Sequence, residues 1–528
     1  MKKQAIWCLV GVLLLSGCGT PSSDAGSEAL RGELPLVEIL PRSPGSCQTQ
    51  VSEFDLGENR YTAASGKVMP YHLRGVVGVP EGEGPFPLVL LTHGSHNNLE
   101  EGLRYDTGFT YLVEALAQNG YVALSMDMGS AYLWQYGDSD DLEKSIYLAD
   151  EHIKALRQGT GYPVELSGKI NWDKVALAGH SRGGAAVFDI AQDQEKKGVA
   201  IGGVLAIAPT LPMDMETLAW DCPTSILVPE YDGDVSTLEG FAIDTALDEH
   251  SPHAVTFLLR ANHNYFNANL TDNDALLARE ETLLTDQLTA EQQRAFLADY
   301  TVDFCNAALL GQTEGTLYAP NVPLPNRMYG LDVMAWMSTG GESALVPVSD
   351  PSAYTVQNAT VRHAEDSWFY AADTVAADTI TFGSGDYQER HLLRVDWSTP
   401  ESQISFVPMV TDFSQGQTLN FRVLTDPADE KNQAGQSFGV VLTDAAGAKS
   451  RVTLPAGLHV LRRTPGRLDK TPIDDKDYSF WSVPTPMGEV AIPLTLFTGV
   501  DLANITEITI CFDQTEQGAL YFEEIALR

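Results

Sequence analysis

The sequence predicts a chain in two parts: an α/β domain built on a mostly parallel sheet, then an all-β domain of sandwich type. The first observation is the alternation of short apolar runs with helical patterns over roughly the first three hundred residues. The second is a change near Val346, after which short alternating runs recur without a convincing helix. The third is the length of 528 residues, which makes two folded units the expectation.

Continuous apolar runs bounded by turn residues predict buried strands in the first part, and apolar residues at helical spacing predict the helices between them. The expected strands are residues 71–79, 88–91, 121–126, 175–178, 203–208, 224–228 and 254–259. The expected helices are residues 109–118, 142–158 and 288–310.

The segment Val175–Gly184 is the most informative stretch. An apolar strand runs into Gly-His-Ser-Arg-Gly, with Ser181 at its centre, and a helical pattern follows. A strand, a tight turn and a helix are the context in which G-x-S-x-G carries a nucleophile. Gly179 and Gly183 leave room around the serine, whose backbone we expect to be strained. The turn would raise the Ser181 hydroxyl from the sheet edge toward a substrate.

This order of strands and helices, together with the Ser181 motif, resembles the α/β-hydrolase fold across Leu73–Gly311. A serine hydroxyl needs a base, and the base needs an acid that orients it. In this fold the order along the chain is nucleophile, acid, histidine. Asp232, which follows the next strand but one, best matches the family pattern, and Asp234 is the alternative. His263, just after the last parallel strand, is the expected base.

The resemblance also implies an oxyanion hole made of two backbone amides. One should belong to Arg182, the residue after the nucleophile, and the other to Ser95, in the loop after an early strand. Gly94 would let that loop approach closely. His93 and His96 are expected to be structural or to line the pocket, because no carboxylate or cysteine accompanies them at metal-ligand spacing.

The substrate side of the site is less defined by the sequence. About fifteen residues separate Ala208 from Thr224, which is short for a helical lid. In this the chain resembles lidless cutinase-like and polyester-cleaving enzymes, and its G-H-S-R-G-G resembles the chlorophyllase turn, although the surroundings of the histidine do not. Tyr132, Trp134 and Tyr136 either form the rim of an apolar acyl or aromatic site or pack a loop.

The N-terminus predicts export. Lys2 and Lys3 precede a short apolar stretch, and Leu-Ser-Gly-Cys18 resembles a bacterial lipobox. That resemblance implies cleavage before Cys18, a lipid on its thiol and anchoring to the cell envelope. The expected organisation is a signal peptide 1–17, a flexible tether 18–45, a catalytic domain 46–311, a linker 312–345 and a β-sandwich 346–528.

Four cysteines remain after the lipobox: Cys47, Cys222, Cys305 and Cys511. An exported chain could pair them in two disulfides, in any of three ways, or keep buried free thiols. The formal net charge of −38 argues against nucleic-acid binding.

The last segments, 502–513 and 519–527, resemble the final strands of galactose-binding-like jelly rolls. The resemblance implies a domain that binds carbohydrate or a polymer surface, and a purely architectural domain is the alternative. The whole chain is therefore expected to be an envelope-anchored serine esterase that cleaves carboxylic esters through an acyl-enzyme, without metal or cofactor. The rival hypotheses are a peptidase or amidase on the same fold, and an inactive carbohydrate-binding lipoprotein.

Overall fold

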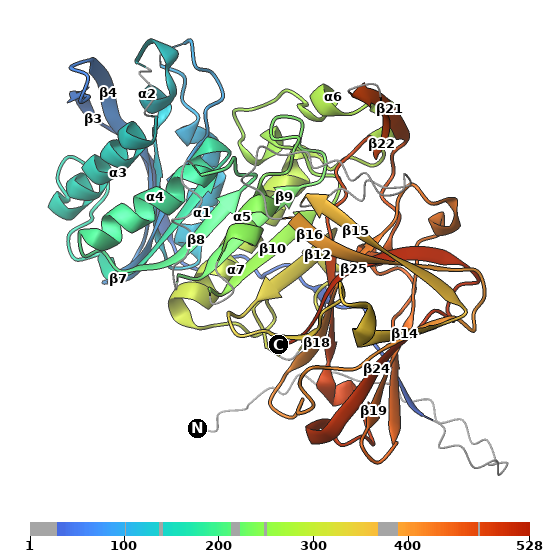
Figure 1. Ribbon diagram of the computed structural model, residues 1–528. Helices are drawn as coiled ribbons and strands as arrows, with labels where there is room; N and C mark the ends of the chain where they lie inside the picture. Colours follow the sequence, from blue (N-terminus) through green and yellow to red (C-terminus); the bar gives the residue numbers. More distant parts are fainter. Residues whose placement is uncertain are drawn as a thin grey trace, which may run out of the picture.

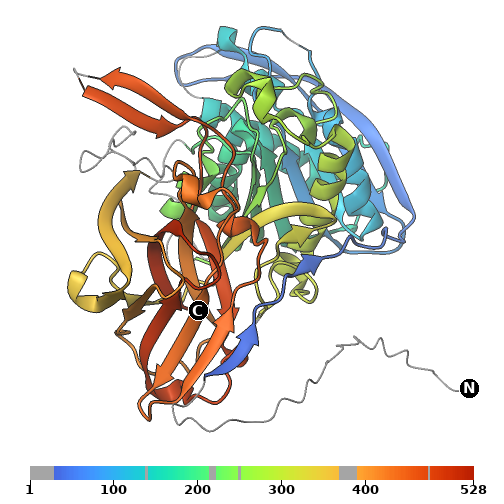
Figure 2. The ribbon, with the colours of Figure 1, turned by 90° about the vertical axis from the view of Figure 1, so that its right-hand side faces the viewer.

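The computed structural model contains two packed parts that lie side by side (Figures 1 and 2). It describes residues 29–100, 102–136, 141–212, 222–247, 251–320, 322–367, 389–473 and 476–528. The predicted signal peptide and Cys18 therefore lie outside the described residues. No helix within these ranges combines the length and the apolar character that crossing a bilayer requires.

The first part is organised around one eleven-stranded sheet, in which six successive neighbours from β10 to β6 run parallel. Antiparallel strands extend it at both ends, where β4 pairs with β6 and β12 pairs with β10. In sheet order the strands are β2 (Glu38–Ile39), β11 (Arg327–Met328), β12 (Leu331–Ser338), β10 (His253–Leu258), β9 (Thr224–Pro229), β8 (Ile201–Ile207), β7 (Ile170–His180), β5 (Phe86–Thr92), β6 (Val122–Met126), β4 (Val68–Pro80) and β3 (Thr49–Thr62).

Helices cover both faces of this sheet (Figure 1). On one face Ile153, Phe188 and Phe241 belong to a single buried core with the strands. On the other face Leu112 and Phe296 belong to a second core. The helices are α1 (Thr110–Gln118), α2 (Gly129–Tyr132), α3 (Asp141–Gln158), α4 (Arg182–Lys196), α5 (Gly240–Ala246), α6 (Ala275–Ala278) and α7 (Ala290–Leu310). This layered α/β architecture brings the carboxyl ends of the parallel strands to one edge.

The second part consists of two sheets that enclose one apolar core, so the expected strand-rich domain is present. One sheet contains β1 (Leu30–Glu33), β20 (Lys449–Thr453), β19 (Gly439–Asp444), β24 (Ile505–Cys511), β17 (Gln403–Phe406) and β14 (Tyr354–Gln357). The other contains β15 (Ala359–Ser367), β16 (Glu389–Trp397), β25 (Gly518–Leu527), β18 (Thr418–Thr425) and β23 (Gly488–Pro493), with β13 (Ser343–Val346) on β25. A separate hairpin, β21 (Leu468–Ile473) with β22 (Lys476–Trp481), reaches beside α6 (Figure 1).

Two segments that the sequence predicts as connections contain strands that pair with sheets of the two domains. In the expected tether, β1 pairs with β20 of the sandwich and β2 pairs with β11 of the large sheet. In the expected linker, β12 adds an antiparallel strand to β10 along its whole length. The described part of the tether and the linker therefore connect the two domains. Their backbone groups form hydrogen bonds with strands of the large sheet and of the sandwich.

The four described cysteines carry free thiols, which is the alternative that the sequence left open. Cys222 and Cys305 are buried, and burial raises the pKa of the Cys222 thiol to about 12. Such thiols act as small apolar side chains in the core.

Candidate active site

Ser181 lies in a turn between β7, which ends at His180, and α4, which begins at Arg182. Its φ of 59° and ψ of −127° are unusual for a residue with a side chain, as expected for a strained nucleophile. The flanking glycines are needed for space. A Cβ on Gly179 would lie 2.2 Å from the carbonyl oxygen of Gly183. The local sequence therefore produces a turn that places one hydroxyl at the carboxyl edge of the sheet, where Ser181 itself is buried.

His263 and Asp232 meet at the same edge, after β10 and β9 respectively. The Nδ1 atom of His263 lies 2.9 Å from Oδ2 of Asp232, and both side chains are buried. The other carboxylate oxygen of Asp232 accepts hydrogen bonds from the backbone N–H groups of Asp234 and Val235, at 3.0 and 2.6 Å. Asp232 is thus fixed by its own turn and faces the ring nitrogen that an orienting acid must hold.

Asp234, the alternative acid, lies on the opposite side of the imidazole. Its Oδ2 is 3.5 Å from Nε2 of His263, and its side chain is 53% exposed. Nε2 itself is buried and has no hydrogen-bond partner among the residues that the structure describes. A bond between this nitrogen and the Ser181 hydroxyl is therefore not formed here, and in enzymes without substrate such bonds are often long.

The residue next to the predicted nucleophile contacts the predicted base. The ring of His180, the residue before Ser181, lies 4.6 Å from the ring of His263 between centroids. Nε2 of His180 also lies 3.1 Å from the backbone oxygen of His263. His96 stacks on His180 at 5.2 Å between centroids, so three imidazoles lie together beside the Ser181 turn.

Burial and charge act in opposite directions on the pKa of His263 but in the same direction on the pKa of His96. Burial lowers the pKa of His263, but Asp232, Asp234 and Asp274 outweigh it and raise the pKa to about 9. For His96 burial and the neighbouring histidines both hold the pKa well below the ordinary value. The site therefore pairs one imidazole that readily holds a proton with neighbours that stay neutral.

The loop after β5 approaches the nucleophile closely. A Cβ on Gly94 would lie 2.4 Å from Cβ and 2.9 Å from Oγ of Ser181, so only glycine fits there without a shift. Nδ1 of His93 lies 2.8 Å from the carbonyl oxygen of Gly94, which gives this histidine a structural role. Ser95 follows directly, and Arg182 begins α4 on the other side of the serine. The two predicted oxyanion residues thus flank Ser181.

Asp274 is a site residue that sequence reasoning missed. It lies in the polar connection 264–286, where no periodic pattern singles it out. Its carboxylate accepts backbone hydrogen bonds from Gly233 at 2.9 Å, His263 at 3.1 Å and Asn264 at 2.9 Å. It therefore joins the loop of the predicted acid to the loop of the predicted base.

Glu230 links the acid loop to the sandwich and was also missed. It is buried, accepts the backbone N–H of Arg260 at 2.8 Å, and pairs with the guanidinium of Arg462 from the β-rich domain. Burial raises the pKa of Glu230, but Arg462, Arg279 and the amide of Arg260 outweigh it and lower the pKa overall. The acid loop is thus held partly from outside its own domain.

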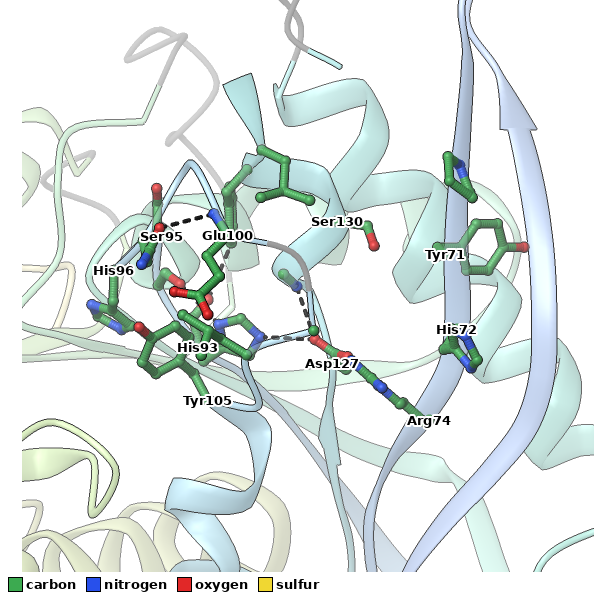
Figure 3. A pocket seen from close by; sticks show the side chains of 18 of the residues that line it. Tyr71, His72, Arg74, His93, Ser95, His96, Glu100, Tyr105, Asp127 and Ser130 are labelled. Carbon is green, nitrogen blue, oxygen red and sulfur yellow. Dashed lines mark hydrogen bonds and ion pairs between the residues drawn. The ribbon is translucent and has the colours of Figure 1, made fainter. Parts of the chain in front are cut away.

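A cavity of about 320 Å³ opens beside the Gly94 loop (Figure 3). Figure 3 shows His96 and Tyr105 at one end and the Arg74–Asp127 ion pair, 2.6 Å between Nε and Oδ2, toward the other. Its labelled lining residues are Tyr71, His72, Arg74, His93, Ser95, His96, Glu100, Tyr105, Asp127 and Ser130. The lining mixes aromatic rings with charged groups rather than forming a purely apolar acyl site.

Of the three predicted rim aromatics, Tyr132 lines this cavity and is buried. Trp134 is exposed, and Tyr136 packs against the core of the large sheet. Residues 213–221, in the connection where a lid would be inserted, lie outside the described residues, so the lidless site stays a prediction.

Two comparisons with known proteins found similar sequences or structures. A family model described as chlorophyllase matches residues 43–224, about a third of the chain, which includes the Ser181 turn but ends before the predicted acid and base. Among solved structures, a ferulic acid esterase from Streptomyces cinnamoneus is 15% identical, with a TM-score of 0.38, over 52% of this chain and 94% of that chain. No curated protein matches. The chlorophyllase match, which covers the segment around Ser181, supports an ester hydrolase activity.

Proposed function

We propose that the chain is a serine hydrolase that cleaves carboxylic esters through an acyl-enzyme. The observation that carries the proposal is the buried pair of His263 and Asp232, 2.9 Å apart, at the strand edge that also bears Ser181 in a strained turn. A serine, a histidine and an aspartate at one sheet edge are the groups that acyl transfer needs.

In this mechanism the Ser181 hydroxyl attacks the ester carbonyl while Nε2 of His263 accepts its proton. Asp232 holds Nδ1–H and stabilises the imidazolium that forms. The amides of Arg182 and Ser95 stabilise the oxyanion, and loss of one such donor would cost roughly 10²–10³-fold in turnover. The imidazolium protonates the departing alcohol. A water molecule, deprotonated by the same ring, then releases the acid and restores Ser181.

The finer assignments are parts of the same proposal. The mixed polar and aromatic cavity favours an ester whose acid or alcohol carries polar groups along with a ring. The short connection after β8 favours an open site that accepts bulky or polymeric esters. The lipobox-like sequence at Cys18 supports anchoring to the cell envelope, and the β-sandwich supports a role in binding carbohydrate or a polymer surface.

The decisive experiment labels the purified protein with a fluorophosphonate and follows hydrolysis of a short p-nitrophenyl ester. Ser181→Ala should lose both labelling and turnover. Ser52→Ala, which changes a serine on β3 of the same domain whose hydroxyl donates to the backbone oxygen of Glu53, is the matched control and should keep both. Hydrolysis by Ser181→Ala at the parent rate would exclude the proposal, and absence of labelling in the parent would favour the inactive lipoprotein.

The choice between the two aspartates is tested separately. Asp232→Asn should lower kcat by roughly 10³–10⁴-fold, because the amide no longer favours the required tautomer of His263. Asp234→Asn should have a much smaller effect, since Asp234 faces the other nitrogen. The reverse ranking would transfer the orienting role to Asp234. Comparing an ester with its matched anilide then separates an esterase from a peptidase or amidase.

A further inference from the structure

Three side chains from separate parts of the sequence converge beside the predicted nucleophile. His96 comes from the loop after β5, Asp234 from the loop after β9, and His263 from the loop after β10. One ligand-type atom from each lies within 4.8 Å of the other two. The sequence spacing does not bring them together, which is why no metal site was expected there.

Two ring nitrogens at this junction form no hydrogen bond within the described part of the chain. Nε2 of His96 and Nε2 of His263 are both buried without a hydrogen-bond partner in the described part of the chain. Buried polar atoms are normally satisfied, so two unsatisfied nitrogens beside one carboxylate call for an explanation. A bound cation would satisfy both nitrogens once it displaces the proton that His263 otherwise holds, since an imidazole nitrogen without its proton is a good ligand for a transition metal.

We propose that a divalent transition metal such as Zn²⁺ binds between His96, Asp234 and His263 and reversibly blocks the site. Zinc takes imidazole nitrogen and carboxylate oxygen at about 2.0–2.2 Å, which places tetrahedral ligands about 3.3 Å apart. Nε2 of His263 and Oδ2 of Asp234 already lie at 3.5 Å. The His96 nitrogen, which lies within 4.8 Å of both, would close on the ion, and the exposed Asp234 gives the ion a path from solvent.

The surroundings of His263 suit a metal ligand as well as a general base. Its Nδ1 lies 2.9 Å from the carboxylate of Asp232, and a metal-bound histidine typically donates its second N–H to such a carboxylate. The metal and the proton of Ser181 would compete for the same Nε2 lone pair. Occupancy by the ion therefore removes the base and leaves the fourth coordination position to water.

Binding is measured first by titrating ZnCl₂ into the Ser181→Ala protein in a calorimeter, because this variant keeps all three ligands. One ion per chain is expected. His96→Gln and Asp234→Asn should each weaken binding at least about tenfold, since three ligands are the minimum for such a site. His363→Gln, which changes an exposed histidine of the sandwich, is the matched control and should bind as tightly as the parent. Absence of a saturable site, or equal binding by all variants, would overturn the proposal.

The nature of the ion and its effect are tested next. Co²⁺ should bind at the same site with the visible absorption of a tetrahedral complex, whereas Mg²⁺ should not compete, because it prefers oxygen ligands. The inhibition, unlike the binding, depends on the proposed esterase function. Zn²⁺ should inhibit ester hydrolysis by the parent, and the inhibitory concentration should rise in Asp234→Asn in step with its weaker binding.

The outcomes separate the two proposals. Zinc binding without any Ser181-dependent hydrolysis would remove the esterase and keep the metal site. Hydrolysis that zinc does not affect, in a protein that shows no zinc binding, would remove only the metal site.

Discussion

The pair of Arg462 and Glu230 makes a sharp prediction about how the β-rich domain supports the active site. Glu230 is almost fully buried two residues before Asp232, and the Arg462 guanidinium reaches it from the sandwich. Removing one partner of a buried ion pair costs about 3–5 kcal/mol because the remaining charge is stranded. Arg279 still faces Glu230, so we expect Arg462→Met to lower the free energy of unfolding by about 3 kcal/mol, the lower end of that range.

The assay is urea unfolding of the full chain, followed by tryptophan fluorescence and by ester hydrolysis. Arg467→Met is the matched control, because Arg467 also comes from the sandwich and pairs with Glu280 of the α/β domain, but both partners are exposed. Exposed pairs contribute little, so this variant should unfold like the parent. Activity should fall along with stability only in Arg462→Met, since Glu230 positions the turn of Asp232.

Two further measurements test the electrostatic cause. The folded-state pKa of Glu230 is lowered, so its pairing stabilises the protein above the ordinary glutamate range and is lost as the pH falls. The difference in free energy of unfolding between the parent and Arg462→Met should therefore become smaller as the pH is lowered. Adding Glu230→Gln to Arg462→Met should recover part of the loss, because no buried charge remains. Equal unfolding of the Arg462→Met and Arg467→Met variants, or strict additivity in the double variant, would refute the reasoning.

The remaining predictions concern the site itself. Because the pKa of His263 is raised to about 9 and the base must be neutral, kcat/KM should increase with pH up to that value, and a plateau already reached near pH 7 would contradict the assigned charges. Gly94→Ala should lower kcat by at least about tenfold by displacing Ser181, whereas Gly341→Ala, where a Cβ meets nothing within 4 Å, should leave the rate unchanged. Asp274→Ala should reduce kcat more than it changes KM, as steady-state kinetics on a soluble ester would show, because it releases three backbone N–H groups that hold the acid and base loops.

Local sequence patterns were sufficient to predict most strands and helices and part of the candidate site. The run before Gly179 and the helical pattern after Gly183 predicted the turn that the structure shows, since period and glycine placement are local properties. The layered α/β part and the strand-rich part were predicted for the same reason. In the segments expected as connections, 18–45 and 312–345, strands as short as β2 and β11 have no period to detect, whereas β12, with eight residues, is long enough to show one and was missed.

The sequence by itself thus determined the strained turn at Ser181, the order of strands and helices, and the short sets of candidates for acid and base. Tertiary structure alone decided which carboxylate faces Nδ1 of His263, how Asp274 joins two loops, and how Arg462 reaches Glu230. The physical reason is that these contacts join residues far apart in the chain. Their distances depend on strand order and on domain packing, which no local periodicity encodes.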